Sequence, residues 1–169
     1  YDKSGENNHF IQTNSTNQPD FKQNFISLNN NPVVEFDAST PSFFEAQDFS
    51  YLTEGEIFAL LTVNNAPATT GNSSGLWSFG TSTSQDHYPY SNNQVYMGFG
   101  RNTRFTVGDI SNDVSLDEPH LLNVLSSAEF NLDINGNNYF NSTSGTADFS
   151  SQVFLGRSRS NHFMSGHIA

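Results

Sequence analysis

Aromatic side chains that also carry a polar group are the residues in this sequence best suited to bind a ligand. Sugar rings are recognised by aromatic faces, which cover their C–H surface, beside amides and carboxylates that bind their hydroxyl groups. The polar segment 85–93 holds two tyrosines, a histidine and two asparagines, and we expect it to be a loop. The sequence therefore predicts a ligand-binding set that consists of Tyr88, Tyr90, His87, Asn92, Trp77 and Tyr139. Trp77 also fits a core position, because it lies inside the apolar run 76–79.

Acidic residues in the sequence suit a hard cation better than a transition metal. Calcium binds carboxylate and carbonyl oxygens, and its expected ligands here are Asp2, Asp37, Asp109 and Asp113. Cysteine is absent and the five histidines form no ligand pair at helical spacing, so a transition-metal site is not expected. If the chain binds a cofactor, calcium is the predicted ion.

The chain is strongly acidic, and its charges are unevenly spread. Six Lys and Arg against 17 Asp and Glu give a net charge of −11, which disfavours binding to nucleic-acid phosphates or anionic membranes. No Lys or Arg occurs between residues 23 and 100, a stretch that holds seven acidic residues. We therefore expect the partner to be a neutral glycan rather than an anionic one, or a neighbouring protein domain. The longest apolar run, Ile57–Leu61, has five residues and is too short to span a membrane.

Hydrophobic residues alternate with polar ones, which is the period of β-strands. Residues 130–134 alternate strictly, and Asn135-Gly136 then predicts a β-hairpin, because both residues tolerate positive φ angles. Further short apolar runs are also expected to be strands, and turn-forming residues flank most of them: 33–36, 57–63, 76–79, 95–99, 105–107, 121–125 and 153–155. Only segment 42–49 suits a short helical turn. About ten strands without long helices predict an all-β sandwich or barrel.

The run at residues 56–63 is almost continuously apolar, which predicts a central strand covered on both faces, or at least not at a sheet edge. Phenylalanines recur inside the expected strands, and we expect them to fill the core between two sheets: Phe36, Phe58, Phe79, Phe99, Phe105, Phe130 and Phe154. A length of 169 residues suits one domain.

Motifs at both ends of the chain carry a resemblance to a known superfamily. They are Asp2-Lys3-Ser4-Gly5-Glu6-Asn7-Asn8-His9, Gln18-Pro19, Pro32-Val33-Val34-Glu35-Phe36-Asp37, Leu155-Gly156-Arg157 and Phe163-Met164-Ser165-Gly166-His167-Ile168-Ala169. With the Asn-Gly hairpin, these segments resemble laminin-G-like, concanavalin A-like lectin/glucanase domains of bacterial or phage type, although Glu6 and Ala38 depart from the pattern. The resemblance implies a jelly-roll β-sandwich of two antiparallel sheets over residues 1–169, with calcium at a rim. It also implies a final strand after Ala169, so we expect residues 1–169 to be one domain of a longer chain.

Catalysis in jelly-roll glucanases requires carboxylates on alternate residues of one strand, where both face the substrate. The nearest pairs here are Glu35/Asp37, Glu54/Glu56 and Asp117/Glu118, and none completes such a motif. We therefore expect a non-catalytic, lectin-like carbohydrate-binding or adhesion module of an extracellular or surface-exposed protein. The alternatives are a structural domain of a phage or virus particle or of an adhesin, and a polysaccharide-degrading enzyme.

Overall fold

The computed structural model describes residues 3–5, 7–47, 49–64, 74–81, 86–159 and 161–169. Across these ranges the chain forms β-strands joined by turns and by two short 3-10 helices, η1 (Ser15–Asn17) and η2 (Ile26–Leu28). The strands are β1 (Asp20–Phe25), β2 (Asn31–Phe36), β3 (Phe44–Ala46), β4 (Gly55–Val63), β5 (Trp77–Ser78), β6 (Gln94–Met97), β7 (Phe105–Asp109), β8 (His120–Ser126), β9 (Phe130–Ile134), β10 (Asn137–Ser142), β11 (Val153–Leu155) and β12 (Gly166–Ile168). The predicted all-β class is confirmed. No helix in the described ranges is long and apolar enough to cross a membrane.

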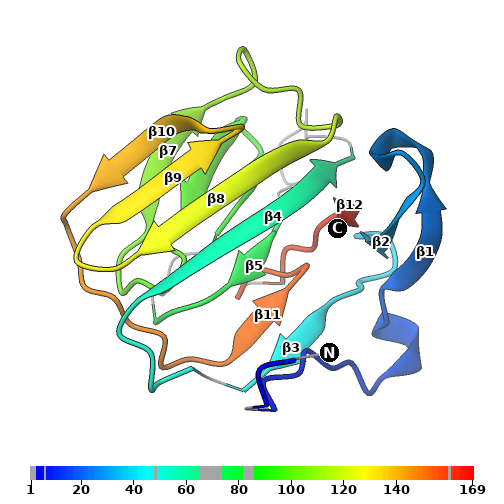
Figure 1. The fold of residues 1–169 in the computed structure, drawn as a ribbon, viewed down its shortest axis with the longest axis horizontal. Coiled ribbons are helices and arrows are strands. Elements are labelled where there is room, and N and C mark those ends of the chain that lie inside the picture. The colour runs from blue at the N-terminus through cyan, green and yellow to red at the C-terminus, as the bar shows by residue number, and fades with distance from the viewer. Residues whose placement is uncertain (1–2, 6, 48, 65–73, 82–85, 160) are drawn as a thin grey trace.

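The strands build one large sheet, which we call the front sheet, and a layer of smaller sheets behind it (Figure 1). The front sheet has the order β1-β2-β12-β4-β8-β9-β10, and every neighbouring pair is antiparallel. In the described ranges the back layer consists of β3-β11-β5 and β6-β7, so it is divided where the sequence predicted a single sheet. Strand β5 is only two residues long, and Gly80 shortly after it has a φ of 90°, which is not strand geometry.

The β9–β10 hairpin confirms the turn predicted at Asn135-Gly136. These two residues have φ angles of 52° and 78°, and Ile134 pairs with Asn137 across the turn. Along β9 the side chains alternate as the sequence predicted, since Phe130, Leu132 and Ile134 are all buried. The Asn-Gly turn therefore sets the position of this hairpin, and the period-two alternation determines which of its side chains point into the core.

Aromatic rings fill the space between the front sheet and the back layer. Trp77 has no exposed surface, and its Nε1 donates a hydrogen bond to Met97 Sδ at 3.1 Å. Its ring contacts Phe79 and Phe99 with centroid separations of 6.2 and 5.8 Å. Phe99 in turn packs edge-on against Phe149 at 5.6 Å. The interpretation of most strand phenylalanines as core residues agrees with this packing.

In segment 42–49, residues Phe44–Ala46 form strand β3 and not the helical turn that the sequence suits. Glu45 is paired on both sides, with Phe154 of β11 and, through an isolated bridge, with Ile11. Phe44 packs edge-on against the Phe36 ring, with centroids 6.0 Å apart. The expectation was wrong because pairing partners distant in sequence override a weak local preference.

Strand β4 lies at the centre of the front sheet, as predicted, but its outer face is uncovered around Phe58 and is buried only at Thr62. Ala59, Leu61 and Val63 point into the core and are buried. Phe58 points the other way and is 65% exposed, and Figure 1 shows no element in front of β4 and β8. The prediction that Phe58 is a core residue is therefore wrong, because the back layer covers one side of the sheet.

Two glycines with positive φ provide a matched test of core packing. A Cβ at Gly156 (φ 82°) would lie 2.2 Å from the Phe36 ring, whereas a Cβ at Gly108 (φ 117°) meets nothing within 4 Å. We expect Gly108→Ala to lower the free energy of unfolding by about 1–2 kcal/mol through backbone strain alone. Gly156→Ala should lower it by about 1–3 kcal/mol more through the clash. Urea denaturation of both variants measures the difference, and equal losses would contradict the packing described here.

Candidate functional site

The outer face of the front sheet carries a continuous row of side chains across four strands. In the strand register, Phe58 of β4 lies opposite Asn123 of β8, Asn123 opposite Asp133 of β9, and Asp133 opposite Asn138 of β10. We call these four residues the outer row. Each of them alternates along its strand with residues that face the core, so the same pairing that builds the core places them on one surface.

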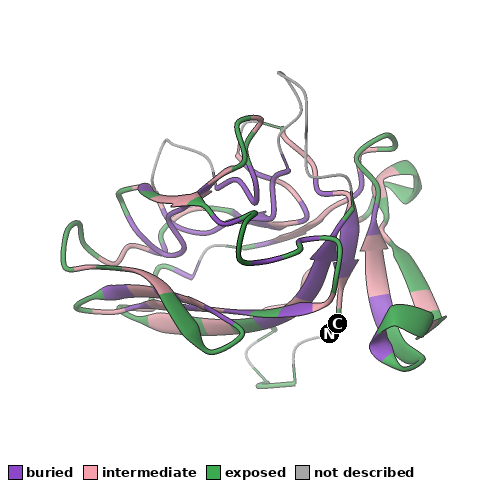
Figure 2. Ribbon diagram, turned by 90° about the horizontal axis from the view of Figure 1, so that it is seen from above, coloured by how far each residue is buried: buried purple, intermediate pink, exposed green. Residues whose placement is uncertain are grey.

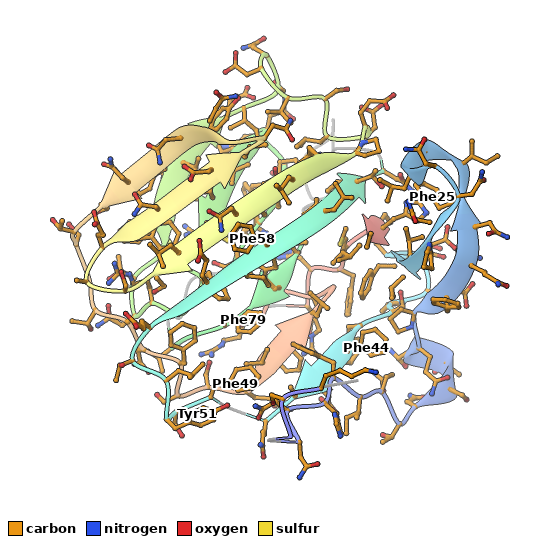
Figure 3. All side chains as sticks on the ribbon, in the orientation of Figure 1. Phe25, Phe44, Phe49, Tyr51, Phe58 and Phe79 are labelled. Carbon is orange, nitrogen blue, oxygen red and sulfur yellow. The ribbon has the colours of Figure 1, made fainter. Side chains whose placement is uncertain are left out.

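Hydrogen bonds fix the polar members of the outer row. Asn138 Nδ2 donates to Asp133 Oδ1 at 2.7 Å. Asn123 Nδ2 donates to Glu56 Oε1 at 3.0 Å and to the Ile57 carbonyl at 3.2 Å. Asn123 adjoins the uncovered Phe58 ring, which Figure 3 shows at the centre of the front sheet, and Asp133 and Asn138 continue the row on the next two strands. The arrangement offers an aromatic face next to oriented donors and acceptors.

Apolar and amide side chains flank the outer row on the same face. Leu60 pairs with Leu121 on one side of it, and Leu121 is exposed. On the other side, Leu125 pairs with Asn131, which in turn pairs with Asn141 of β10. Leucines thus add apolar surface to the face over β4 and β8, and the face becomes rich in amides over β9 and β10.

A network around the buried His167 holds the β1–β2 hairpin against β12 and β4. His167 Nδ1 lies 2.9 Å from Thr62 Oγ1, and its Nε2 lies 3.3 Å from Glu35 Oε1. Lys22 Nζ contacts the other oxygen of Glu35 at 2.9 Å. The Phe25 ring stacks on His167 with centroids 4.0 Å apart. Figure 2 shows the hairpin standing apart at one end of the molecule, where most of its residues are exposed or intermediate.

The order hydroxyl, imidazole, carboxylate in this network is also that of nucleophilic triads. Thr62, however, is only 1% exposed, so its hydroxyl does not reach a substrate at the surface. Burial lowers the pKa of His167, although the neighbouring Glu35 acts in the opposite direction. Hydrogen bonds from Lys22 to Glu35 and Asp20 raise the pKa of Lys22. The network therefore connects β1, β2, β12 and β4 rather than forming an accessible nucleophile.

A polar cavity of about 460 Å³ lies beside Glu35, where β2 and β4 end and β12 begins. Hydroxyls, amides and carboxylates dominate its lining, which consists of Thr16, Gln18, Asp20, Glu35, Phe36, Asp37, Thr40, Ser42, Asn64 and Ser165. Hydrogen bonds from Thr40 and then Ser39 lower the pKa of Asp37, whose carboxylate holds the turn after β2. The cavity has the size of a small-ligand site.

Two of the predicted ligand-binding aromatics lie in the core. Trp77 and Tyr88 have no exposed surface, and the Tyr88 hydroxyl lies 3.0 Å from His120 Nε2. Tyr139 is half-buried and packs against the same core. Trp77 and Tyr88 have no free face for a sugar because they are packed against residues from distant segments, which the loop-like sequence around Tyr88 did not indicate.

The other predicted residues cluster on the back layer with Tyr96 and Arg104. Tyr90 is 36% exposed, and its ring lies 4.8 Å from that of the buried His87. Tyr96 of β6 packs edge-on against Tyr90 at 5.7 Å, and the Arg104 guanidinium lies 4.3 Å from the Tyr96 ring. Asn92 is exposed in the same turn, where its side chain accepts a hydrogen bond from the Gln94 amide.

The predicted calcium ligands do not meet in the part of the chain that the structure describes. Asp2 lies outside the described residues. Asp37 and Asp109 each accept hydrogen bonds from a serine two residues further on, and the Asp113 amide donates to the Ile110 carbonyl. The described residues contain no group of three or more His, Cys, Asp or Glu placed to hold a metal ion. Calcium binding stays a prediction.

The outer row was missed at the sequence level, although a signal for it exists. Asn123 lies between the buried Leu122 and Val124, and Asp133 lies between the buried Leu132 and Ile134. Polar residues enclosed in this way must face outward on their strands. Their alignment with Phe58, however, depends on strand order, which alternation alone does not give.

The fold is shared with proteins of distant sequence. No protein-family model and no curated protein matches the chain. The binding domain of Paraclostridial Mosquitocidal Protein 1 aligns over 99% of this chain and 44% of its own length, with 12% identity and a TM-score of 0.64. The enzymatically active domain of tailspike protein 2 of bacteriophage CBA120 aligns over 90% of this chain and 26% of its own, with 13% identity and a TM-score of 0.57.

Full-length tailspike protein 2 of an Escherichia coli O157:H7 bacteriophage aligns over 95% of this chain and 24% of its own, with 14% identity and a TM-score of 0.56. This chain therefore spans less than half the length of each of these three structures. At such low identity the likeness shows the all-β fold and not an activity.

Buried histidines make the fold sensitive to mild acid. Burial lowers the pKa of His87 to about 3 and also lowers the pKa values of His120, His162 and His167. Unfolded histidines take up protons below a pH of about 6.5, whereas the folded ones resist, so stability is present above that pH and is lost as the pH falls. We expect the urea midpoint to decrease steadily from pH 7 to pH 4.5.

A variant without one of these imidazoles provides the control. His120→Gln keeps a hydrogen-bonding group beside Tyr88 but does not titrate, so its urea midpoint should fall less steeply over the same pH range. The buried Asp86, whose pKa burial raises, acts in the opposite direction in both proteins and cancels in the comparison. If the urea midpoints of the wild type and of His120→Gln fell equally with pH, the buried His120 would not contribute to the acid sensitivity.

Proposed function

We propose that this chain is a non-catalytic carbohydrate-recognition module of a larger extracellular, cell-surface or virion protein, and that it binds glycan on the outer face of the front sheet. One observation carries the proposal: Phe58 is 65% exposed on the central strand, in register with oriented amides and a carboxylate. A large ring that an apolar strand leaves uncovered is a candidate contact surface.

The chemistry of this face suits a neutral sugar. The C–H face of a pyranose packs on an aromatic ring, and its hydroxyl groups exchange hydrogen bonds with carboxamides and carboxylates. Phe58 supplies the ring, while Asn123, Asp133 and Asn138 supply the polar groups. The outer row contains a carboxylate and no cation, which favours a neutral glycan over an anionic one.

The finer fold assignment belongs to the same proposal. Antiparallel layers and the similarity to a toxin's binding domain support a concanavalin A-like jelly roll. The tailspike likeness supports a place in a longer surface or virion protein. Calcium is the proposed ion, because the carboxylate and carbonyl oxygens that are plentiful in this chain are the ligands that it prefers.

A second candidate function is docking against a neighbouring protein in a virion or adhesin. Phe21 and Ile26 are strongly exposed on and just after β1, which lies at one end of the front sheet. An edge strand with exposed apolar side chains offers both backbone groups and hydrophobic surface to a partner. This surface is separate in the strand order from the outer row.

Affinity electrophoresis in gels that contain neutral polysaccharides tests the first proposal. We expect the wild-type chain to be retarded by at least one glycan, and Phe58→Ala to weaken binding about tenfold through loss of ring stacking. Phe21→Ala, which removes an equally exposed ring from β1, is the matched control and should bind as the wild type does. Parallel gels with calcium and with a chelator test the ion.

Three results would contradict non-catalytic glycan binding at Phe58. Retardation that Phe58→Ala leaves unchanged but Tyr90→Ala abolishes would move the site to the back layer. Absence of retardation in every gel, together with a complex lost in Phe21→Ala, would favour the docking function. Release of reducing ends or unsaturated products from a retarding glycan would identify an enzyme.

A further inference from the structure

Two histidines far apart in sequence meet in the back layer. The rings of His87 and His162 have centroids 4.9 Å apart and planes tilted by 56°. His87 is 1% exposed and is held by backbone hydrogen bonds in both directions with Tyr96. His162 lies in the turn before β12, where its carbonyl accepts from the Ser158 amide at 2.9 Å. The main chain at both residues is therefore held by backbone hydrogen bonds.

Their ring nitrogens differ from those of the other buried histidines. His120 has both nitrogens engaged, by the Glu118 carbonyl at 2.9 Å and by Tyr88 Oη at 3.0 Å. His167 likewise has Thr62 on one nitrogen and Glu35 on the other. The Nδ1 atoms of His87 and His162, by contrast, are both buried without a hydrogen-bond partner. Buried polar atoms normally have a partner, so two orphan nitrogens on adjacent rings indicate a missing one.

We propose that His87 and His162 form a two-imidazole site for a divalent transition metal ion of the zinc type, bound through both Nδ1 atoms. Metal–imidazole bonds are about 2.1 Å long, and two imidazoles on one ion at a near-tetrahedral angle have ring centroids about 5 Å apart. The observed separation of 4.9 Å fits this geometry. The described residues supply no third His, Cys, Asp or Glu to the pair, so both protein ligands are imidazoles.

The surroundings set the expected strength of the site. Arg104, whose guanidinium lies 4.3 Å from the Tyr96 ring, acts electrostatically on His87 and opposes a dication. With two protein ligands and this opposing charge, we expect micromolar rather than nanomolar affinity. A bound ion would tie the segment before β6 to the turn before β12. This inference does not depend on the proposed glycan binding.

Zinc binding to the whole chain tests the site without any glycan. We expect isothermal titration calorimetry to give one Zn²⁺ per chain, and the melting temperature to rise with Zn²⁺ concentration. His87→Phe and His162→Phe should each weaken this binding roughly tenfold or more, since each removes one of two ligands. His9→Gln, which changes a histidine outside the pair, is the control and should retain wild-type affinity.

A measurement on the unmodified chain covers the case in which a variant does not fold. In ¹⁵N spectra of the imidazole rings, Zn²⁺ should shift the Nδ1 signals of His87 and His162 and leave those of His120 and His167 in place. No zinc uptake by the wild type, or unshifted Nδ1 signals at saturating zinc, would overturn the proposal. Equal zinc affinity in the wild type and in folded His162→Phe would overturn it as well.

Discussion

Removal of the inner face of the front sheet from water is the constraint around which this molecule is arranged. Leu61, Leu122 and Leu132, on three adjacent strands, have no exposed surface. Each such side chain contributes about 1.5–3 kcal/mol by burial, more than any surface contact described here. The back layer must supply apolar rings to this face, and Trp77 and Phe99 do so. The back layer can therefore be divided and β5 can be short, because aromatic rings, and not a continuous sheet of hydrogen-bonded strands, cover the inner face of the front sheet.

The candidate glycan face is a geometric consequence of the same burial. Strand pairing that turns Ala59 and Leu122 inward must turn Phe58 and Asn123 outward, because successive side chains alternate. A slip of one residue in β4 would bury Phe58 and expose Leu61, so core packing protects the outer row from register errors. Recognition residues on such a sheet are held more rigidly than residues on loops.

Buried imidazoles connect parts of the chain that strand pairing alone leaves apart. His167 links β12 to Glu35 on β2 and to Thr62 on β4, and through Glu35 it reaches Lys22 on β1. In the core, His120 fixes the Tyr88 hydroxyl. The solvation cost of burying these rings is offset by hydrogen bonds at both nitrogens. The pair in the back layer lacks this compensation at Nδ1, which sets it apart within the same protein.

Sequence alone determined what depends on near neighbours: the all-β class, the Asn135-Gly136 hairpin and the central place of β4, because alternation and turn chemistry are local. Only the tertiary structure decided which side of each strand is covered. It buried Trp77 and Tyr88, left Phe58 exposed, made Phe44–Ala46 a strand and brought the His162 ring to His87. These outcomes depend on pairing between distant segments, and neither residue type nor spacing records which strand lies beside which.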